Sequence, residues 1–564
     1  MWRDVRRLTL RAALVAGQVA RRMTRRLPPY GLLKLTLSGD LPEQEDEPRL
    51  FGLLRRSTGD YAGLLGVLRW ARDDLRIRGV LIHCGDLRIG WAKAQGLHRS
   101  LLALRGAGKR VWVHLTHVDL HTYLIASAAE HIALAPAGTI DVAGLSTEVT
   151  FFLGALEKLG IEAEIVQLGR YKSMAESFTR RDMSDAHREM IEALVDDLYG
   201  QVVDAVAAGR QLMPDTLRSL LDRGPFLARE ALHEGLVDSL AYEDQAEAEL
   251  MRVCDGAKAI EFADFRARRG REVHAEVLRR RRPTLAILHL TGTVKTGDSV
   301  SGPEGAAAIG AASVARELAT LCEREDIKGI ILRVASPGGS GLASDLIWRE
   351  VARARERKPV VVSFGDVAAS GGYYIGVAGA PVFAEGGTLT GSIGVVAGKA
   401  NLHGLYERLG ITKGIVSRGR HAAIHSAYVP LSDDDRAMLA AQAEEFYRDF
   451  MAKVADGRRL SEAAVAEIAQ GRVWTGRQAS VRGLVDRLGG LEEALAEAKR
   501  LVGIPPDELV AIERFPTPRR LWKLSLDLNR PQTHVGELLD RITTLRFVVS
   551  ERVWAILPLQ FRFF

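Results

Sequence analysis

One serine in the sequence stands where a nucleophile could act. Ser370 lies in the run GDVAASGGYYI at residues 365–375, directly after an apolar run at residues 359–364 that is typical of a fully buried strand. A serine at a glycine-lined turn from a strand into a helix can hold its hydroxyl clear of the sheet, while nearby backbone N–H groups face a developing negative charge. Small residues at such turns more often serve packing, so the rest of the chain must decide whether Ser370 does chemistry.

An internal repeat organises the chain. The string GVLIH at residues 79–83 corresponds to GIILR at residues 329–333, an offset of 250 residues that also relates Tyr123 to Tyr373. Further along the offset is 248 residues, which relates GLVD at residues 235–238 to its second occurrence. Unrelated sequences would not keep register over such a length, so the chain carries two copies of one architecture.

Each copy predicts strands that alternate with helices. The expected strands are residues 30–37, 79–83 and 110–114 in the first copy and 285–290, 329–334 and 359–364 in the second. This alternation implies βαβ units with right-handed crossovers and a mostly parallel sheet. Long amphipathic helices are expected at residues 184–209 and 432–457, each opening on a Ser-Asp N-cap. The predicted fold class is α/β, with two tandem βαβ repeats and long amphipathic helices.

The two copies differ where chemistry would occur. Ser370 has Leu120 as its counterpart in the first copy, whereas Lys172 in the first copy has Ala422 as its counterpart in the second. Each copy therefore keeps one polar group and lacks the other, the pattern expected of a single site shared between the copies. Independent drift of surface residues is the alternative.

A lysine beside a serine could perform acyl transfer. A serine hydroxyl is a weak nucleophile until a base takes its proton, and a lysine amine can be that base only when it is neutral. The ordinary lysine pKa of about 10.4 must then be lowered, which burial against apolar walls can do. An interface between the two copies could supply such burial.

Three strings of the second copy stand out: RVASPGGS at residues 333–340, VAASGGY at 367–373 and TLTGSIG at 388–394. Together they resemble signal peptide peptidase A (protease IV) in its long form with a duplicated domain. In the first copy, YKS at residues 171–173 and ESF at 176–178 are similar to that family's lysine motif, YKSAxEPF, from which Met174 and Ser177 depart. The resemblance covers roughly residues 30–510.

The resemblance implies a ClpP/crotonase-like spiral fold and an ATP-independent serine endopeptidase with a Ser–Lys dyad. Such an enzyme would degrade cleaved signal peptides or other short apolar peptides without a cofactor or metal. The resemblance further implies these roles: Ser370 as nucleophile, Lys172 as general base, Ser392 orienting the lysine, and the backbone of Gly338, Gly339 and Gly371 as oxyanion hole. The alternatives are a crotonase-like acyl-CoA enzyme, which uses the same oxyanion hole without the dyad, and a non-enzymatic membrane-associated scaffold.

Composition excludes other classes of protein. With 47% hydrophobic and 26% charged residues and a net charge of +6 over 564 residues, the chain is ordinary globular material without the signature of a nucleic-acid binder. Its three cysteines form no CxxC pair, so neither a disulfide framework nor a zinc site is indicated. His114, His117 and His121 lack a fitting carboxylate motif and are interpreted as a polar loop of the first copy.

The ends of the chain raise the question of membrane contact. The apolar run at residues 12–20 is less than half of the roughly 20 residues that a spanning helix needs, and no transmembrane helix is expected. Its arginine-rich surroundings are consistent with an amphipathic helix on an anionic membrane, a solvated tail or a short signal peptide. The resemblance implies a homotetramer, peripheral membrane contact and association with a bacterial inner membrane, on a side that the sequence does not indicate. The predicted domains are residues 1–29 (basic segment), 30–282 (lysine repeat), 283–510 (serine repeat) and 511–564 (apolar extension).

Overall fold

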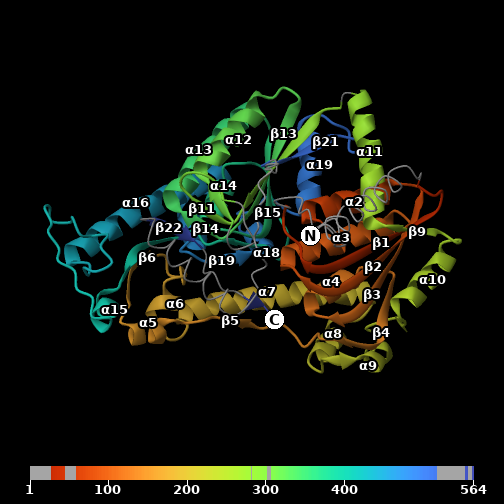
Figure 1. Ribbon diagram of the computed structural model, residues 1–564, viewed down its shortest axis with the longest axis horizontal. Helices are drawn as coiled ribbons and strands as arrows, with labels where there is room; N and C mark the ends of the chain where they lie inside the picture. The colour runs from red at the N-terminus through yellow and green to blue at the C-terminus, as the bar shows by residue number, and fades with distance from the viewer. Residues whose placement is uncertain are drawn as a thin grey trace, which may run out of the picture. The chain divides into compact units, whose positions relative to one another are not determined.

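The computed structural model describes residues 27–44, 59–280, 282–300, 307–516, 553–556 and 562–563. These residues form two compact units (Figure 1). Unit 1 holds the described residues up to Gly144, Val202–Arg282 and Leu509–Ala511. Unit 2 holds Leu145–Gln201, Pro283–Glu508 and the described residues from Ile512 onward. Most of the predicted segments 1–29 and 511–564 lie outside the described residues.

Unit 1 is built on a seven-stranded sheet in the order β7-β4-β3-β2-β1-β9, with β8 beside β4. The neighbours β1, β2, β3 and β4 run parallel, as the βαβ pattern predicted. The strands are β1 (Gly31–Asp40), β2 (Ile77–Arg88), β3 (Arg110–Val118), β4 (His131–Ile140), β7 (Phe226–Leu227), β8 (Ser239–Leu240) and β9 (Lys258–Glu261). The helices are α2 (Tyr61–Asp73), α3 (Trp91–Gly106), α4 (Leu120–Ala126), α8 (Pro214–Leu221), α9 (Ala228–His233), α10 (Glu243–Val253) and α11 (Phe262–Arg280).

Unit 2 contains an eight-stranded sheet of the same plan, in the order β19-β17-β15-β13-β10-β21, with β16 joining β15 to β20. Its central strands β10, β13 and β15 are parallel and almost wholly buried, as expected of strands covered on both faces. The strands are β10 (Thr284–Thr291), β13 (Ile327–Ser336), β15 (Val360–Ala369), β16 (Val382–Ala384), β17 (Leu389–Gly391), β19 (Val473–Thr475), β20 (Arg487–Leu488) and β21 (Ala511–Phe515). The repeated parallel sheet confirms the predicted α/β fold class.

Helices bury the core of unit 2 against this sheet. Leu288, Val334 and Phe364 of the sheet pack in one cluster with Ile347 and Tyr373 of the covering helices. The helices are α5 (Leu153–Leu159), α6 (Glu176–Thr179), α12 (Ala311–Glu323), α13 (Gly341–Arg357), α14 (Gly371–Gly376), α15 (His403–Arg408), α16 (Asp433–Arg458), α17 (Glu462–Ile468), α18 (Gly476–Val481) and α19 (Leu491–Leu501). Helix α7 (Asp185–Arg210) begins in unit 2, and it and α16 confirm the two predicted long helices.

A second, six-stranded sheet of unit 2 recruits a strand from the first repeat. Its order is β12 (Ala308–Gly310), β11 (Thr293–Lys295), β14 (Gly338–Ser340), β22 (Val553–Ile556), β18 (Val395–Asn401), β6 (Glu162–Leu168). The edge strand β6 runs antiparallel to β18, from Leu168 opposite Val395 to Glu162 opposite Asn401. Residues 145–201 therefore belong to the first repeat by sequence and to unit 2 by their contacts. A two-stranded ribbon, β5 (Thr147–Glu148) with β23 (Arg562–Phe563), adds to this unit.

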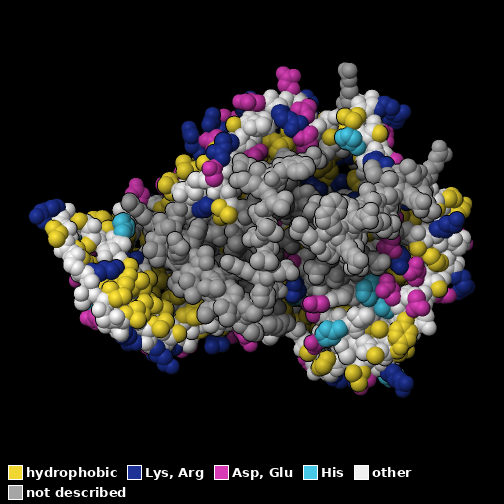
Figure 2. All heavy atoms as spheres, viewed as in Figure 1, with side chains coloured by type: hydrophobic (Ala, Val, Ile, Leu, Met, Phe, Trp, Pro, Cys, Tyr) yellow, Lys and Arg dark blue, Asp and Glu magenta, His cyan; other side chains and the backbone are white. Residues whose placement is uncertain are grey.

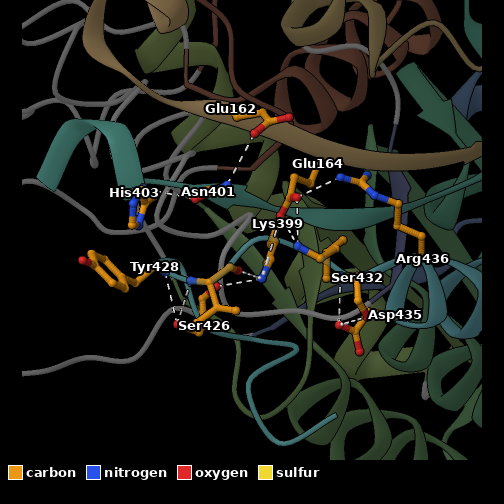
Figure 3. Close-up of polar contacts among 12 residues, drawn as sticks. Glu162, Glu164, Lys399, Asn401, His403, Ser426, Tyr428, Ser432, Asp435 and Arg436 are labelled. Carbon is orange, nitrogen blue, oxygen red and sulfur yellow. Dashed lines mark hydrogen bonds and ion pairs between the residues drawn. The ribbon is translucent and has the colours of Figure 1, made fainter. Parts of the chain in front are cut away.

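A buried carboxylate fastens β6 to the second repeat. Glu164, whose side chain is 1% exposed, accepts hydrogen bonds from the Leu431 N–H at 2.9 Å and from Arg436 Nη2 at 2.9 Å (Figure 3). The Lys399 amine lies 3.8 Å from the same carboxylate and donates to the Ser426 carbonyl. These bonds hold β6, and with it the residues that follow β6, in one place on unit 2.

The described surface carries charges of both signs. On the face in Figure 2, Lys and Arg side chains are interspersed with Asp and Glu side chains rather than gathered in one field. Among the described residues, no helix is both long and apolar enough to cross a membrane.

Candidate active site

Ser370 sits between the last residue of β15 and the first of α14. Its φ of 54° and ψ of −116° are unusual for a residue with a side chain, and such backbone strain persists only where the surrounding structure enforces it. The Ser370 N–H donates to the Gly391 carbonyl at 2.8 Å, and its carbonyl accepts from the Tyr374 N–H at 2.8 Å. Sheet and helix thus fix this serine from both sides, and its side chain is completely buried.

A glycine lets α14 approach the neighbouring strand. A Cβ atom on Gly372 would lie 2.6 Å from the Ser336 carbonyl oxygen at the end of β13. Helix α14 also contacts β14, which carries the predicted oxyanion glycines Gly338 and Gly339. The Ser370 turn and the second glycine turn are therefore neighbours, with Gly371 opening α14 between them.

Lys172 reaches Ser370 from the loop after β6. Its Nζ lies 2.7 Å from Ser370 Oγ, 3.0 Å from Ser392 Oγ and 3.1 Å from the Ser392 carbonyl oxygen. A neutral amine has two N–H donors and one lone pair. The two N–H groups can donate to the two oxygens of Ser392, and the lone pair can accept from the hydroxyl of Ser370, so every hydrogen-bonding group of the neutral amine has a partner. The structure brings together the three predicted side chains Ser370, Lys172 and Ser392, all within unit 2.

The environment of Lys172 favours its neutral form. The side chain is completely buried. Burial alone holds the pKa of Lys172 well below its ordinary value, since no charged neighbour contributes. This is the condition that a lysine must meet to accept a proton near neutral pH.

The loop at residues 470–472 aligns the lysine with Ser392. The Tyr171 N–H donates to the Gln470 carbonyl at 2.8 Å, and the Ser392 N–H donates to the Arg472 carbonyl at 2.8 Å. Between them, a Cβ on Gly471 would lie 2.6 Å from Lys172 Cβ and 2.7 Å from its backbone nitrogen. Sequence reasoning missed this loop. At the offset of 248 residues Gly471 stands opposite Arg223, a difference between the repeats that marks the position but does not indicate its contact with Lys172.

Gly471→Ala is expected to lower kcat by about 10²-fold, because a shift of about 1 Å in a reacting group has that effect. The new methyl group must displace the Lys172 backbone and so disturb the approach of its amine to Ser370. Gly503→Ala is the matched control, since Gly503 has a similar φ of 71° but nothing within 4 Å of the added Cβ. In urea denaturation both variants should lose stability through their positive φ, and Gly471→Ala should lose about 1–3 kcal/mol more because its methyl group also meets the Lys172 backbone. Equal kcat values for the two would contradict the proposed contact with Lys172.

Aromatic and charged side chains close the outer side of this loop. The Arg472 guanidinium lies over the rings of Tyr171 and Trp474, 4.6 Å from each centroid. Glu189 of α7 accepts from Arg472 Nη1 at 2.5 Å and from the Tyr171 hydroxyl at 3.2 Å. Arg472 thereby ties the residue before Lys172 to α7 and to β19.

The predicted oxyanion glycines have backbones that favour glycine. Gly338 and Gly339 have φ angles of 102° and 155°. The Gly338 N–H donates to Ser336 Oγ at 3.1 Å, and Ser340 caps α13 by accepting from the Ala343 N–H. Ser336 and Ser340 thus shape this turn.

The first repeat has no serine at the position that corresponds to Ser370. The prediction that three histidines form a polar loop is wrong, because His114 and His117 lie on β3 and His121 lies in α4. Their neighbours are in unit 1: His114 Nδ1 lies 2.9 Å from His83 Nδ1, His117 bonds Thr139, and His121 stacks on Trp91. In the part of the chain that the structure describes, no group of three or more His, Cys, Asp or Glu residues could hold a metal ion. The counterpart of Ser370, Leu120, is buried in unit 1.

Comparisons with known proteins match both repeats to one protein family. The family model described as peptidase family S49 matches residues 103–255 and 352–505, which are corresponding stretches of the two repeats. The chain is 32% identical over 475 residues to the chloroplastic serine protease SPPA of Arabidopsis thaliana, covering 84% of this chain and 68% of that protein. It is 29% identical to protease 4 of Salmonella typhi, over 94% of this chain and 85% of that protein. Protease 4 of Haemophilus influenzae is also 29% identical, over 89% and 84% of the two chains.

Solved structures that match include a membrane-bound stomatin-specific protease, with a TM-score of 0.27 at 12% identity over 42% of this chain and 99% of that one. The assignment rests instead on the family model, which covers more than half of the chain, and on the Arabidopsis relative. The chain belongs to peptidase family S49, a family of serine peptidases, and carries the family's domain in duplicate.

Proposed function

We propose that this protein is an ATP-independent serine endopeptidase in which Ser370 is the nucleophile and Lys172 the general base. The observation that carries the proposal is the 2.7 Å distance between Lys172 Nζ and Ser370 Oγ, together with the complete burial of that amine. A nucleophile within hydrogen-bond distance of a base that is itself oriented by a third group is the recurring arrangement of covalent hydrolases.

The reaction proceeds in two halves. As Ser370 Oγ attacks the peptide carbonyl, its proton passes to the neutral amine of Lys172, which then delivers a proton to the leaving amine. A water molecule next loses a proton to the same lysine and attacks the acyl-enzyme, and the lysine then passes that proton to Ser370 Oγ as the acid product leaves, which restores the neutral amine. Both oxygens of Ser392 keep the amine aimed at Ser370 through these steps.

The negative charge of the tetrahedral intermediate requires backbone donors. We assign these to Gly371, next to the nucleophile, and to the turn of Gly338 and Gly339. Since Gly338 donates to Ser336 Oγ at 3.1 Å, the intermediate must share or replace that bond. Removing one such donor typically costs 10²–10³-fold in rate.

Strand β22 supports an extended peptide as the substrate. It runs antiparallel to β14, with Gly339 opposite Ala555, and antiparallel to β18, with Val396 opposite Trp554. The gap between β14 and β18 can thus accept a strand beside the Ser370 turn. We propose that a substrate binds here by strand addition, in place of β22, because main-chain hydrogen bonds give affinity for any extended chain.

Cleaved signal peptides and other short apolar peptides are the substrates we propose, on the basis of relatives named SppA and protease 4. The test is hydrolysis of fluorogenic signal-peptide substrates by purified wild-type protein, with and without detergent, and with Ser370→Ala as the blank. Mass spectrometry of the products identifies the cleaved bond. Hydrolysis of acyl-CoA thioesters without any peptide cleavage would overturn the proposal in favour of a crotonase-like enzyme. If the protein hydrolysed neither peptides nor acyl-CoA thioesters, the result would favour a non-enzymatic scaffold.

Removal of residues 517–564 is expected to lower KM several-fold and leave kcat within about twofold, because β22 no longer competes with the substrate. Progress curves with the fluorogenic peptide measure both constants. A higher KM after truncation would show instead that β22 helps to form the substrate site.

Assembly and membrane contact are proposed from the family resemblance. We propose a homotetramer and peripheral contact with a bacterial inner membrane through the basic segment 1–29. Light scattering tests the tetramer. Carbonate extraction of membranes, with and without residues 1–27, tests the contact, and equal partitioning of the two forms would remove that segment as the anchor.

A further inference from the structure

A buried carboxylate lies four residues after Lys172. Glu176, which is 6% exposed, accepts from Ser184 Oγ at 2.6 Å, from the Ser184 N–H at 3.1 Å and from His187 Nδ1 at 3.1 Å. His187 is completely buried, and within the described residues its Nε2 has no hydrogen-bond partner. None of these three bonds reaches Ser370 or Ser392, so the proposed chemistry leaves this cluster without a role.

The carboxylate is rigidly joined to the lysine. All residues from Lys172 to Glu176 are buried, and the turn between them is closed by bonds from the Ser173 N–H to the Tyr171 carbonyl at 2.8 Å and from the Glu176 N–H to the Ser173 carbonyl at 3.1 Å. A movement of Glu176 would therefore move the backbone of Lys172.

On its other side, the cluster is joined to the nucleophile. Ser184 caps the first turn of α7 by accepting from the His187 N–H at 3.2 Å. One turn further, Met190 and Ile191 pack against Ala369, the residue before Ser370. Helix α7 thus rests on the strand that carries the nucleophile, and Glu176 connects the lysine turn to this helix.

We propose that Glu176, with Ser184 and His187, is a positioning residue that locks the Lys172 turn to α7 and so keeps the amine dry and within reach of Ser370. This inference rests on the proposed peptidase function. Burial of Glu176 opposes its ionisation, but the bonds from His187 and Ser184 outweigh it, and the pKa of Glu176 lies below its ordinary value. The carboxylate therefore accepts all three bonds in its charged form, the stronger kind of hydrogen bond.

The second repeat contains the same kind of link without a lysine to position. At the offset of 248 residues, Ser184 and His187 correspond to Ser432 and Asp435. There the imidazole comes from the loop: His421 Nδ1 lies 2.6 Å from Asp435 Oδ1, and Ser432 caps α16 (Figure 3 draws the Ser432–Asp435 pair). Because Ala422 takes the place of Lys172 in the second repeat, loss of the His421–Asp435 bond disturbs a similar link that positions no lysine, and His421 is therefore a matched control.

The test compares Glu176→Ala with His421→Ala in the full-length protein. Glu176→Ala is expected to lower kcat by about 10²-fold with KM within about twofold of wild type, since the lysine loses its alignment but the strand-binding gap does not change. Water reaching the amine would also move the acidic limb of the kcat/KM profile to higher pH. His421→Ala should retain the wild-type profile. A Glu176→Ala profile with its acidic limb unmoved would overturn the proposal.

A second readout does not depend on activity. The acetylation rate of Lys172 by acetic anhydride, measured by mass spectrometry, should rise at least tenfold in Glu176→Ala and stay unchanged in His421→Ala. If Lys172 were acetylated equally slowly in both variants, the proposal would also be overturned. If the wild type cleaves no peptide but protection is lost only in Glu176→Ala, the positioning role stands and the peptidase function fails. Should Glu176→Ala not fold, Glu176→Gln, which keeps the shape and loses the charge, undergoes the same two measurements.

Discussion

Ser370→Ala is expected to lower peptide cleavage by at least about 10⁴-fold, because removal of a nucleophile leaves only what binding and the oxyanion donors contribute. The protein should stay folded, since the backbone bonds of Ser370 to Gly391 and Tyr374 do not involve its hydroxyl. The fluorogenic peptide assay measures the loss, and thermal denaturation verifies the fold. Cleavage by a folded Ser370→Ala protein at more than a hundredth of the wild-type rate would contradict the assignment of the nucleophile.

Ser370→Gly separates the chemistry from the strain at this position. It should be as inactive as Ser370→Ala but more stable by roughly 1 kcal/mol, because a φ of 54° with a ψ of −116° strains any residue that has a Cβ. Ser344, a buried residue within α13, is the control. There glycine should be less stable than alanine by about 1 kcal/mol, as in any helix interior. If urea denaturation showed that glycine is less stable than alanine at position 370 as well as at position 344, the strain at Ser370 would be refuted.

The features that depend on local pattern could be predicted from the sequence. Helices α7 and α16 begin and end within one residue of their predicted bounds, because a 3.6-residue apolar period and a serine N-cap are local properties. The strand that precedes Ser370 was visible as the apolar run at residues 359–364, although β15 continues five residues further, to Ala369. The comparison of the repeats also paired Lys172 with Ser370, since each polar group occurs only once.

The features that depend on tertiary pairing could not be predicted. Nothing in the run at residues 162–168 indicates that it pairs with β18 of the second repeat rather than with its own, because the edge of a sheet can accept any strand of matching polarity. This pairing, together with the bonds of Tyr171 and Lys172 to the second repeat, places the lysine turn inside unit 2. Likewise, the role of Gly471 depends on its contact with Lys172, about 300 residues away in sequence. The role of Glu176 depends on its bond with His187, about 10 residues away.

Lys172→Met is expected to abolish cleavage to the same extent as Ser370→Ala and, in contrast to most active-site losses, to make the protein more stable below about pH 10. Methionine fills nearly the same volume and carries no charge. The sign follows from linkage. Burial lowers the pKa of Lys172 well below 10.5 in the folded state, whereas the unfolded chain titrates near 10.5. The unfolded state therefore binds more protons between these two values.

Wild-type stability should accordingly fall, relative to Lys172→Met, by about 1.4 kcal/mol for each pH unit below 10.5, until the folded pKa is reached. At pH values below the folded-state pKa of Lys172, the stability difference between wild type and Lys172→Met stays constant. Urea denaturation of both proteins between pH 6 and about 10 measures it. Lys328→Met, which removes a lysine exposed on β13, is the control for the loss of a surface charge and undergoes the same measurement. A difference independent of pH at Lys172 would show that the lysine is charged in the folded protein.

Lys172→Arg distinguishes a base from a buried positive charge. A guanidinium remains protonated at any pH that the fold survives, so it cannot accept the proton of Ser370. It would also bury a charge that has only the oxygens of two serines near it, at a cost of several kcal/mol. Lys172→Arg should therefore be inactive and, unlike Lys172→Met, less stable than wild type. Activity retained in Lys172→Arg would mean that the site requires a positive charge at this position, and the role of Lys172 as general base would have to be abandoned.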